Sequence, residues 1–512
     1  MVHYEPMKGW ALVGVTISLA MATFMNVLDT TIANVSIPAI AGGLAVTPNQ
    51  GTWVITSYAV ATAIVVPLSG WLAANFGEVR TFVTCTLLFS FVSILCGFSH
   101  NFETLVVFRV LQGAVAGPMI PLSQSLLLRC YPEERRGTAL SFWAMTTVVA
   151  PIVGPIMGGW ITDNIGWPWI FYINGPVGVA AAFSAWSFLR ARETPVVRKP
   201  VDTVGLALLV IGVGSLQMLF DIGNAHDWFS SAHVWILAIT ATMGLSFFIA
   251  WELTEEHPVV DLSLFRDWNF TLGTLTLSMG FMVFFGGIVI FTLWLQTQMG
   301  YTASWAGLAA SPTGILSLLI TPFVGILVHR MDARILGTFA FLIYAYTSFW
   351  QAGFNTDATF YDVAMPRFVL GAGMACLFVP MTTITFSRIP REKIASAAGV
   401  TNFCRLVAAG FGASLAVTMW ENRAALHQSH LVENVTWYGG PASEALDQMV
   451  AGGMEMPGAL TMMMITIRRQ AVMMATCDIY WISGALFCVM LGLVWLTRRV
   501  QPHSGPKAPA KG

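Results

Sequence analysis

Long apolar stretches constrain this chain more than any other feature. About fourteen of them reach the length of a membrane-spanning helix, roughly 20 residues. In lipid, every backbone N–H and C=O group must find a partner within the protein, so we expect α-helices rather than open strands. Charged residues make up only 10% of the 512-residue chain, whereas a soluble chain is about 25% charged. The sequence therefore predicts an all-α integral membrane protein, with spans at residues 11–34, 52–73, 80–98, 104–128, 137–160, 168–190, 203–221, 233–252, 269–296, 302–328, 334–354, 363–386, 396–420 and 479–498.

Basic residues are distributed unevenly between the predicted loops. One set of alternate loops holds nineteen Lys and Arg residues, and the other set holds only Arg423, Arg468 and Arg469, all in one long loop. Loops rich in Lys and Arg stay in the cytoplasm. We therefore expect both chain ends to be cytoplasmic and the long loop to face outward.

Several function classes are disfavoured by composition and motifs. The net charge of -1 argues against a nucleic-acid partner. The seven cysteines include no CxxC spacing, which argues against a zinc site or a disulfide framework. The sequence contains no HExxH, GxSxG or P-loop motif, so we expect neither an enzyme nor a use of ATP, and we expect no metal and no cofactor.

An internal repeat divides the chain. Pro67–Leu72 resembles Pro322–Leu327, and Arg109–Gly113 resembles Arg367–Gly371, at offsets of 255 and 258 residues. Parallel repeats predict two six-helix bundles with a site near the membrane midplane between them. The two surplus spans form an insert. The expected division is an N-terminal bundle at 1–195, two inserted helices at 196–256, a C-terminal bundle at 257–500 that includes the long loop 421–477, and a disordered tail at 501–512.

The long loop is rich in methionine. Its interpretation stays open between an amphipathic hairpin that touches a partner or the membrane surface and a loosely packed loop. The methionines are Met454, Met456, Met462, Met463, Met464, Met473 and Met474.

An acidic residue, Asp29, lies inside the first span, where insertion costs roughly 2.5–3.5 kcal/mol. Asn26, Thr30 and Asn34 share its helical face, so this face is expected to point into the bundle. The alternative role for Asp29 is a structural hydrogen bond near a helix end.

Arg109 lies inside the fourth span and shares a face with Gln112, Gly113 and Gln124. Asp29 is about 13 Å and Arg109 about 8 Å from the outer end of its helix, so the two are expected to pair. Burial raises the pKa of an aspartate and a nearby arginine lowers it, which suits an acid that gains and loses a proton. The alternative is a structural arginine in a tightly packed seam.

The fifth span combines prolines with small residues. Gly154 and Gly158 form a GxxxG ridge that lets another helix approach closely, and Pro155 removes a backbone donor. Pro151 and Gly159 complete the cluster. Structural packing alone is the alternative explanation.

Candidate substrate contacts occur in the second half. Phe284 and Phe285 offer apolar contacts, although lipid-facing aromatic residues would look the same. Asn402 and Arg405 lie near mid-depth, where they contact substrate or close a polar network between the bundles.

These motifs resemble the major facilitator superfamily, and within it the fourteen-helix drug:proton antiporters of the EmrB type. The likeness covers nearly the whole chain. Leu28–Val35 followed by Pro38 resembles the first-helix motif, Arg109–Gly113 resembles the fourth-helix motif whose Arg is implicated in proton coupling, and Gly154–Gly159 resembles the antiporter motif of the fifth helix.

One loop departs from the family pattern. After the second helix the family places an acid four residues beyond the first glycine, whereas the segment from Gly70 to Gly77 has Ala74 at that position. We therefore expect the inward gate that links the bundles to use Glu78 or Arg80.

The resemblance implies a bacterial inner-membrane protein that exports hydrophobic drugs, dyes, uncouplers or fatty acids in exchange for protons. It also implies a periplasmic adaptor of the membrane-fusion type and an outer-membrane channel. The alternatives are a transporter of another substrate class, such as a metabolite or nutrient symporter, and a receptor that does not transport.

Overall fold

The computed structural model describes residues 7–132, 136–197, 200–223, 226, 228–256, 258–328, 331–390, 393–433, 435 and 440–499, and this part of the chain contains helices and no strand. All fourteen predicted spans fall on helices. Within the described residues, eleven helical stretches are long and apolar enough to cross a membrane, and some of these stretches join consecutive helices named below. The count of fourteen crossings stays a prediction. The helices of four residues or more are α1 (Gly9–Gly43), α2 (Pro48–Gly51), α3 (Trp53–Val65), α4 (Ser69–Phe76), α5 (Glu78–Gly97), α6 (Phe102–Ala116), α7 (Met119–Cys130), α8 (Arg136–Asn164), α9 (Trp169–Tyr172), α10 (Asn174–Leu189), α11 (Thr203–Ile222), α12 (Ala232–Glu252), α13 (Trp268–Thr297), α14 (Ala303–Ala310), α15 (Pro312–Leu327), α16 (Ala333–Gln351), α17 (Phe360–Phe386), α18 (Ile394–Glu433), α19 (Pro441–Ala451) and α20 (Met456–Leu496), with a 3₁₀ helix η6 at Leu262–Arg266.

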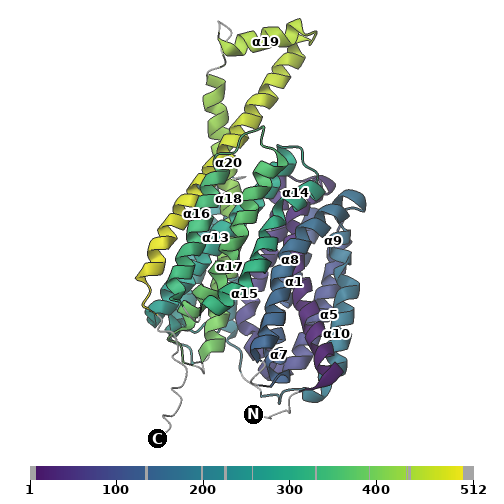
Figure 1. Cartoon of the computed structure of the whole chain (residues 1–512), viewed down its shortest axis with the longest axis vertical. Helices are drawn as coiled ribbons and strands as arrows, with labels where there is room; N and C mark the ends of the chain where they lie inside the picture. Colours follow the sequence, from purple (N-terminus) through teal and green to yellow (C-terminus); the bar gives the residue numbers. More distant parts are fainter. Residues whose placement is uncertain are drawn as a thin grey trace.

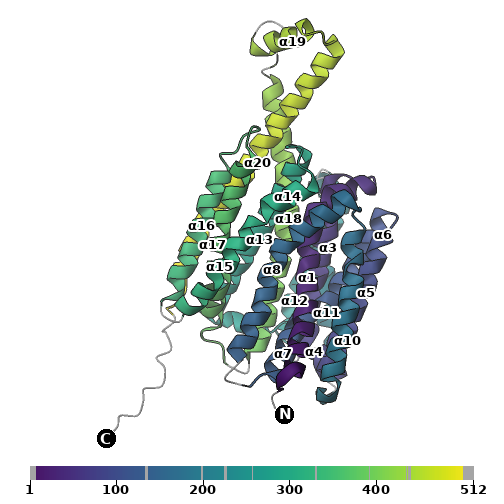
Figure 2. The ribbon, with the colours of Figure 1, turned by 45° about the vertical axis from the view of Figure 1, so that its right-hand side comes forward.

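The helices gather into two halves that lie side by side (Figures 1 and 2). In the first half, α1, α5, α7 and α10 bury an apolar core that includes Phe82 and Phe89. In the second half, α13, α16, α17 and α20 bury another core that includes Phe341 and Tyr344. Burial of these large side chains supplies the packing within each half.

One of the two inserted helices, α11, lies against both halves. α11 packs along α12, and α11 also contacts α3 of the first half and α18 of the second. Val60 of α3, Leu209 and Val213 of α11, and Val400 of α18 share one buried apolar cluster. The insert is thus a bridge rather than an appendage.

The first helix is longer than its predicted span of residues 11–34 and does not end at Pro38. α1 continues through Pro38 to Gly43. A proline removes one helical hydrogen bond, but neighbouring helices in a membrane bundle hold such a helix together.

Among its described residues, the long loop 421–477 is largely helical, which agrees with the hairpin alternative rather than with a loosely packed loop. α18 extends to Glu433, α19 crosses the tip, and α20 begins at Met456, so the segment forms a projection beyond the bundle (Figure 1). We call residues 421–477 the hairpin, and the end of the bundle that carries it the hairpin side. α1 begins and α20 ends on the opposite, terminal side (Figure 1). The predicted tail 501–512 lies outside the described residues.

Polar contacts join the two halves on the hairpin side. Gln296 Nε2 donates to the carbonyl of Val35 at 2.9 Å. The carboxylate of Asp163, near the end of α8, accepts the backbone N–H of Ser304 at 2.8 Å and so caps α14. Asn49 Nδ2 donates to Glu421 at 2.8 Å. These bonds hold the halves together at this end.

Candidate functional site

A fully buried ion pair lies within the first half. Arg109 Nη1 of α6 is 2.6 Å from Asp29 Oδ2 of α1, and both side chains are 0% exposed. An isolated charge at this depth would be costly, and pairing with added hydrogen bonds offsets that cost. The sequence predicts that these two residues lie close together, and the structure places them in direct contact.

Amide side chains complete the surroundings of the carboxylate. Asp29 Oδ1 accepts from Gln112 Nε2 at 3.2 Å and from Asn174 Nδ2 at 2.8 Å. Asn174 belongs to α10 and also donates to Ser93 Oγ at 3.0 Å. Three donors from α6 and α10 therefore hold the acid on α1.

The guanidinium group of Arg109 is held on several sides. Nε donates to the carbonyl of Val54 at 2.8 Å, and Nη1 donates to Gln112 Oε1 at 2.7 Å. The ring of Tyr58 lies 4.2 Å from the guanidinium carbon, which adds a cation–π contact. Nη2 has no hydrogen-bond partner among the described residues. This donor is available for a group that enters when the packing changes.

The second half contains a related arginine without an acid. Arg367 lies 3.8 Å from the ring of Phe291 and donates to the carbonyl of Gly287 at 3.2 Å. The offset of 258 residues that relates Arg109 to Arg367 also relates Asp29 to Gly287. A backbone carbonyl therefore occupies the position of the acid, and the arginine–carboxylate pair is present in one half only, as far as the described residues extend.

The other polar residues predicted on these faces separate into two groups. Asn26 joins the network, because it accepts from the Tyr58 hydroxyl at 3.3 Å and donates to the carbonyl of Ala116. Thr30 and Asn34 bond to carbonyls of their own helix. Gln124 is half-buried on α7. Among these residues, Asn26 and Gln112 therefore extend the ion-pair network.

The glycine ridge of α8 packs against both halves. A Cβ on Gly158 would lie 2.7 Å from Ile32 Cγ1, and a Cβ on Gly154 would collide with Thr31, both on α1. A Cβ on Gly159 would collide with the backbone of Ala303, and the carbonyl of Pro155 lies against Gly307, both on α14. Pro151 lies within α8. The ridge therefore brings α8 into close contact with the first helix of its own half and with the other half.

Substitution of Gly158 by alanine is expected to destabilise the protein. The added methyl has no room between α8 and α1, and overpacking of this kind costs about 1–3 kcal/mol. Gly399→Ala is the matched control, because a methyl group at this position on α18 would have no heavy atom within 4 Å. Thermal unfolding of the two purified variants checks this. Equal midpoints would contradict the tight approach.

The candidate residues of the second half lie around Arg405. The Arg405 guanidinium on α18 lies 4.6 Å from the ring centre of Phe281 and 5.1 Å from that of Phe378. Phe285 stacks on Phe281 at 5.9 Å. Phe284 packs edge-on against Tyr344 and belongs to the second core, so its role is largely structural. Asn402 is half-buried one turn before Arg405.

The gating loop is held within the first half. Glu78 pairs with Arg129 at 3.0 Å, and Glu193 accepts the backbone N–H groups of Val79 and Arg80 at the start of α5. Gly77 has a φ of 91°, which favours glycine at this turn, and Gly70 lies in α4. In this structure Glu78 and Arg80 bind within their own half and Ala74 offers no carboxylate, so the use of these residues in an inward gate stays a prediction.

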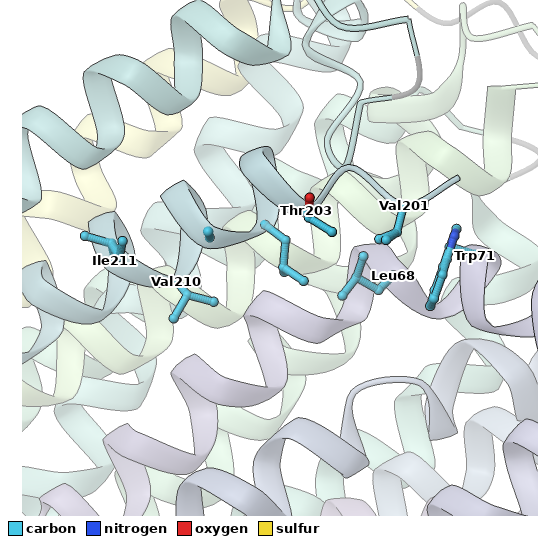
Figure 3. A pocket seen from close by; sticks show the side chains of 8 residues that line it. Leu68, Trp71, Val201, Thr203, Val210 and Ile211 are labelled. Carbon is cyan, nitrogen blue, oxygen red and sulfur yellow. The ribbon is translucent and has the colours of Figure 1, made fainter. Parts of the chain in front are cut away.

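An open apolar groove of about 480 Å³ lies beside the insert (Figure 3). Leu68 and Trp71 line one wall, and residues of the first half of α11, including Val210 and Ile211, line the other (Figure 3). Its lining suits lipid chains and includes none of the ion-pair residues.

Two parts of the polar interior were not identified from the sequence. Asn174 and Ser93 look like ordinary helix residues, and only their depth within apolar spans marks them. Asp221, near the end of α11, is the last residue of the predicted span 203–221, and an acid at the edge of an apolar span was the available signal.

Comparison with known proteins gives consistent results along the chain. A family model described as Major Facilitator Superfamily matches residues 19–413. The chain is 47% identical to "Multidrug export protein EmrB" of Haemophilus influenzae over 97% of each chain. It is also 47% identical to "Fatty acid resistance protein FarB" of Neisseria gonorrhoeae, over 97% of this chain and 98% of the relative.

Solved structures share the fold. A bacterial homolog of the lysosomal transporter Spinster, in an inward-facing and unoccupied conformation, matches with a TM-score of 0.62 and 16% identity over 96% of this chain and 98% of the other. A D-xylose-proton symporter matches with a TM-score of 0.62 and 12% identity over 96% and 99%. At such identities the likeness concerns the arrangement of helices alone.

Proposed function

This chain belongs to the major facilitator superfamily, and we propose that it is a proton-coupled antiporter that exports hydrophobic drugs, uncouplers or fatty acids. The single observation that carries the proton coupling is the buried Asp29–Arg109 pair. The relatives named for multidrug export and fatty acid resistance support the substrate class.

The proposed cycle uses the carboxyl of Asp29 as the proton carrier. A proton from the outer side neutralises Asp29, and Arg109 loses its partner. Arg109 then forms hydrogen bonds with other acceptors. The halves rock, and the substrate leaves on the outer side. Deprotonation toward the cytoplasm restores the pair. The membrane potential contributes about 2.3 kcal/mol per charge per 100 mV to a cycle that moves net charge.

Burial of the pair explains why proton entry and rocking are linked. Both side chains are 0% exposed in this arrangement, so neither reaches water without movement of the helices that cover them. Helix α1, which carries Asp29, lies at the seam between the halves, because it also contacts α13. A change in charge at Asp29 therefore acts on the helix packing between the halves, which must change when they rock.

The proposed substrate path runs along the second half, past Phe285, Asn402 and Arg405. Arg405 Nε has no hydrogen-bond partner among the described residues, and the guanidinium lies against phenylalanine rings. A cation in apolar surroundings matches an amphipathic anion, such as a fatty acid or an ionised uncoupler.

Arg405→Gln is expected to reduce export of anionic substrates about tenfold or more and to spare cationic dyes. Loss of one charge-assisted hydrogen bond costs about 1.5–3 kcal/mol. Resistance profiles of cells that express the variant check this, with Arg405→Lys as the charge-preserving control. Equal loss for anions and cations would contradict a substrate contact and indicate a structural role.

We also propose that the protein lies in the bacterial inner membrane with both ends cytoplasmic. The hairpin then projects into the periplasm, where a membrane-fusion adaptor would bind it and continue to an outer-membrane channel. Met456, Met462 and Met464 are exposed on the hairpin, and flexible thioether side chains suit such a contact. The division at residues 195/196 and 256/257 is proposed to mark the rigid units that move.

The deciding experiment measures transport by purified protein in liposomes. An imposed proton gradient is expected to drive uptake of a fluorescent drug against its concentration gradient, with protons moving the opposite way. Co-movement of solute and protons in the same direction would instead indicate a symporter of a metabolite or nutrient. Absence of any flux under all gradients would indicate a receptor.

A further inference from the structure

We infer that Asp221 is a positioning residue through which the inserted helix α11 holds the two halves together on the hairpin side. This inference rests on the proposed alternating-access function. Asp221 is not part of the Asp29 network, and it binds groups from three separate structural units.

The contacts of this carboxylate define the latch. Oδ2 accepts from the hydroxyl of Thr56, on α3 of the first half, at 3.0 Å. Oδ1 accepts from the hydroxyl of Ser414, on α18 of the second half. Oδ1 also accepts from Gln217 Nε2, one turn earlier on α11, at 2.8 Å. One side chain thus joins both halves to the insert.

Gln217 reinforces the same junction. Its Nε2 also lies 2.7 Å from Ser414 Oγ, so the amide binds both the acid and the second half. Gln217 and Ser414 are 4% and 3% exposed, respectively. Buried hydrogen-bond networks of this kind are strong when complete and costly when one member is lost.

The hydrogen-bond donors found around Asp221 among the described residues are neutral groups, those of Thr56, Ser414 and Gln217. These neutral donors stabilise the carboxylate. Separation of α3 from α18 removes Thr56 or Ser414, and the carboxylate then loses a donor in a poorly solvated place. The conformation in which Thr56 and Ser414 both donate to Asp221 is therefore favoured.

The position of the latch determines which conformation it favours. Thr56 lies near the start of α3 and Asp221 near the end of α11, both toward the hairpin side, where the Asp163 and Gln296 contacts also join the halves. Opening of this side must break the latch. Asp221 consequently controls how often the transporter opens toward the hairpin side.

The test is a distance measurement between the halves. Spin labels at Ile165 of the first half and Trp305 of the second, both exposed, report the separation on the hairpin side in a background without reactive cysteines. Asp221→Asn is expected to raise the ratio of open to closed molecules about tenfold or more, because a charged hydrogen-bond acceptor is lost. Thr56→Val and Ser414→Ala are expected to shift it in the same direction.

Thr242→Val is the matched control, because the Thr242 hydroxyl on α12 bonds only to its own helix at Ala238 among the contacts described. An unchanged distance distribution in Asp221→Asn, at wild-type thermal stability, would overturn the inference. So would shifts in opposite directions for Thr56→Val and Ser414→Ala. If the variants shift as expected while the wild-type protein moves no protons, the latch stands and the proposed function fails.

Discussion

Asp29→Asn is expected to abolish proton-driven export while the protein still folds and inserts. The amide is similar in size, so the packing of α1 against α6 and α10 is preserved. It carries no charge and takes up no proton at physiological pH, so the gradient has nothing to act on. In liposomes, drug accumulation driven by a proton gradient should fall to the level of protein-free vesicles.

Binding and exchange measurements separate this effect from misfolding. Arg109 keeps its bonds to Val54 and Gln112 and its contact with Tyr58, so the variant should remain stable enough to purify. It should still bind drug. Asn174→Asp is a useful companion, because it adds a second acid beside the first and should impair the cycle by charge repulsion. Normal drug resistance in Asp29→Asn would reject Asp29 as the proton site.

The sequence predicts much of the fold, because the lipid bilayer strictly limits which structures can span it. Every predicted span falls on a helix, since apolar length is nearly sufficient in lipid. Helix ends are less predictable. α1 passes through Pro38 and α18 extends far beyond its apolar span, because packing and helix propensity, rather than the membrane boundary, decide where a helix stops.

Some contacts of the site could be predicted from the sequence and others could not. The pairing of Asp29 with Arg109 could be predicted, because opposite charges at matching depth have few other partners in a membrane. The roles of Asn174 and Asp221 could not be predicted from their positions alone. The role of an amide or a lone acid depends on which helices pack beside it, and the three-dimensional arrangement decides which helices those are.

The gating loop shows which part of a motif-based prediction needs the structure. Glu78 and Arg80 carry suitable charges, yet their partners Arg129 and Glu193 come from the same half. Motif spacing specifies residue types but not which neighbouring surface they meet. The contacts that do join the halves, at Asp163 and Asp221, lie on the opposite side of the molecule.

Arg109→Ala is expected to be both inactive and strongly destabilised. Removal of one member of a buried ion pair leaves an uncompensated charge and typically costs about 3–5 kcal/mol. Gln112 and Asn174 still donate to Asp29, but neither supplies a positive charge. Without Arg109 no cation remains to pair with Asp29 and to be released from it, so the variant is expected to be as inactive as Asp29→Asn.

A double-mutant cycle distinguishes this cause from simple loss of packing. If the uncompensated charge is responsible, Asp29→Asn combined with Arg109→Ala should be more stable than Arg109→Ala alone, because no buried charge remains. Arg423→Ala serves as control, since its pair with Asp478 is partly exposed and should cost about 1 kcal/mol or less. Thermal unfolding in detergent gives the four stabilities. Additive losses of stability in the double variant would mean that the two charges do not interact. The proposed coupling mechanism would then be contradicted.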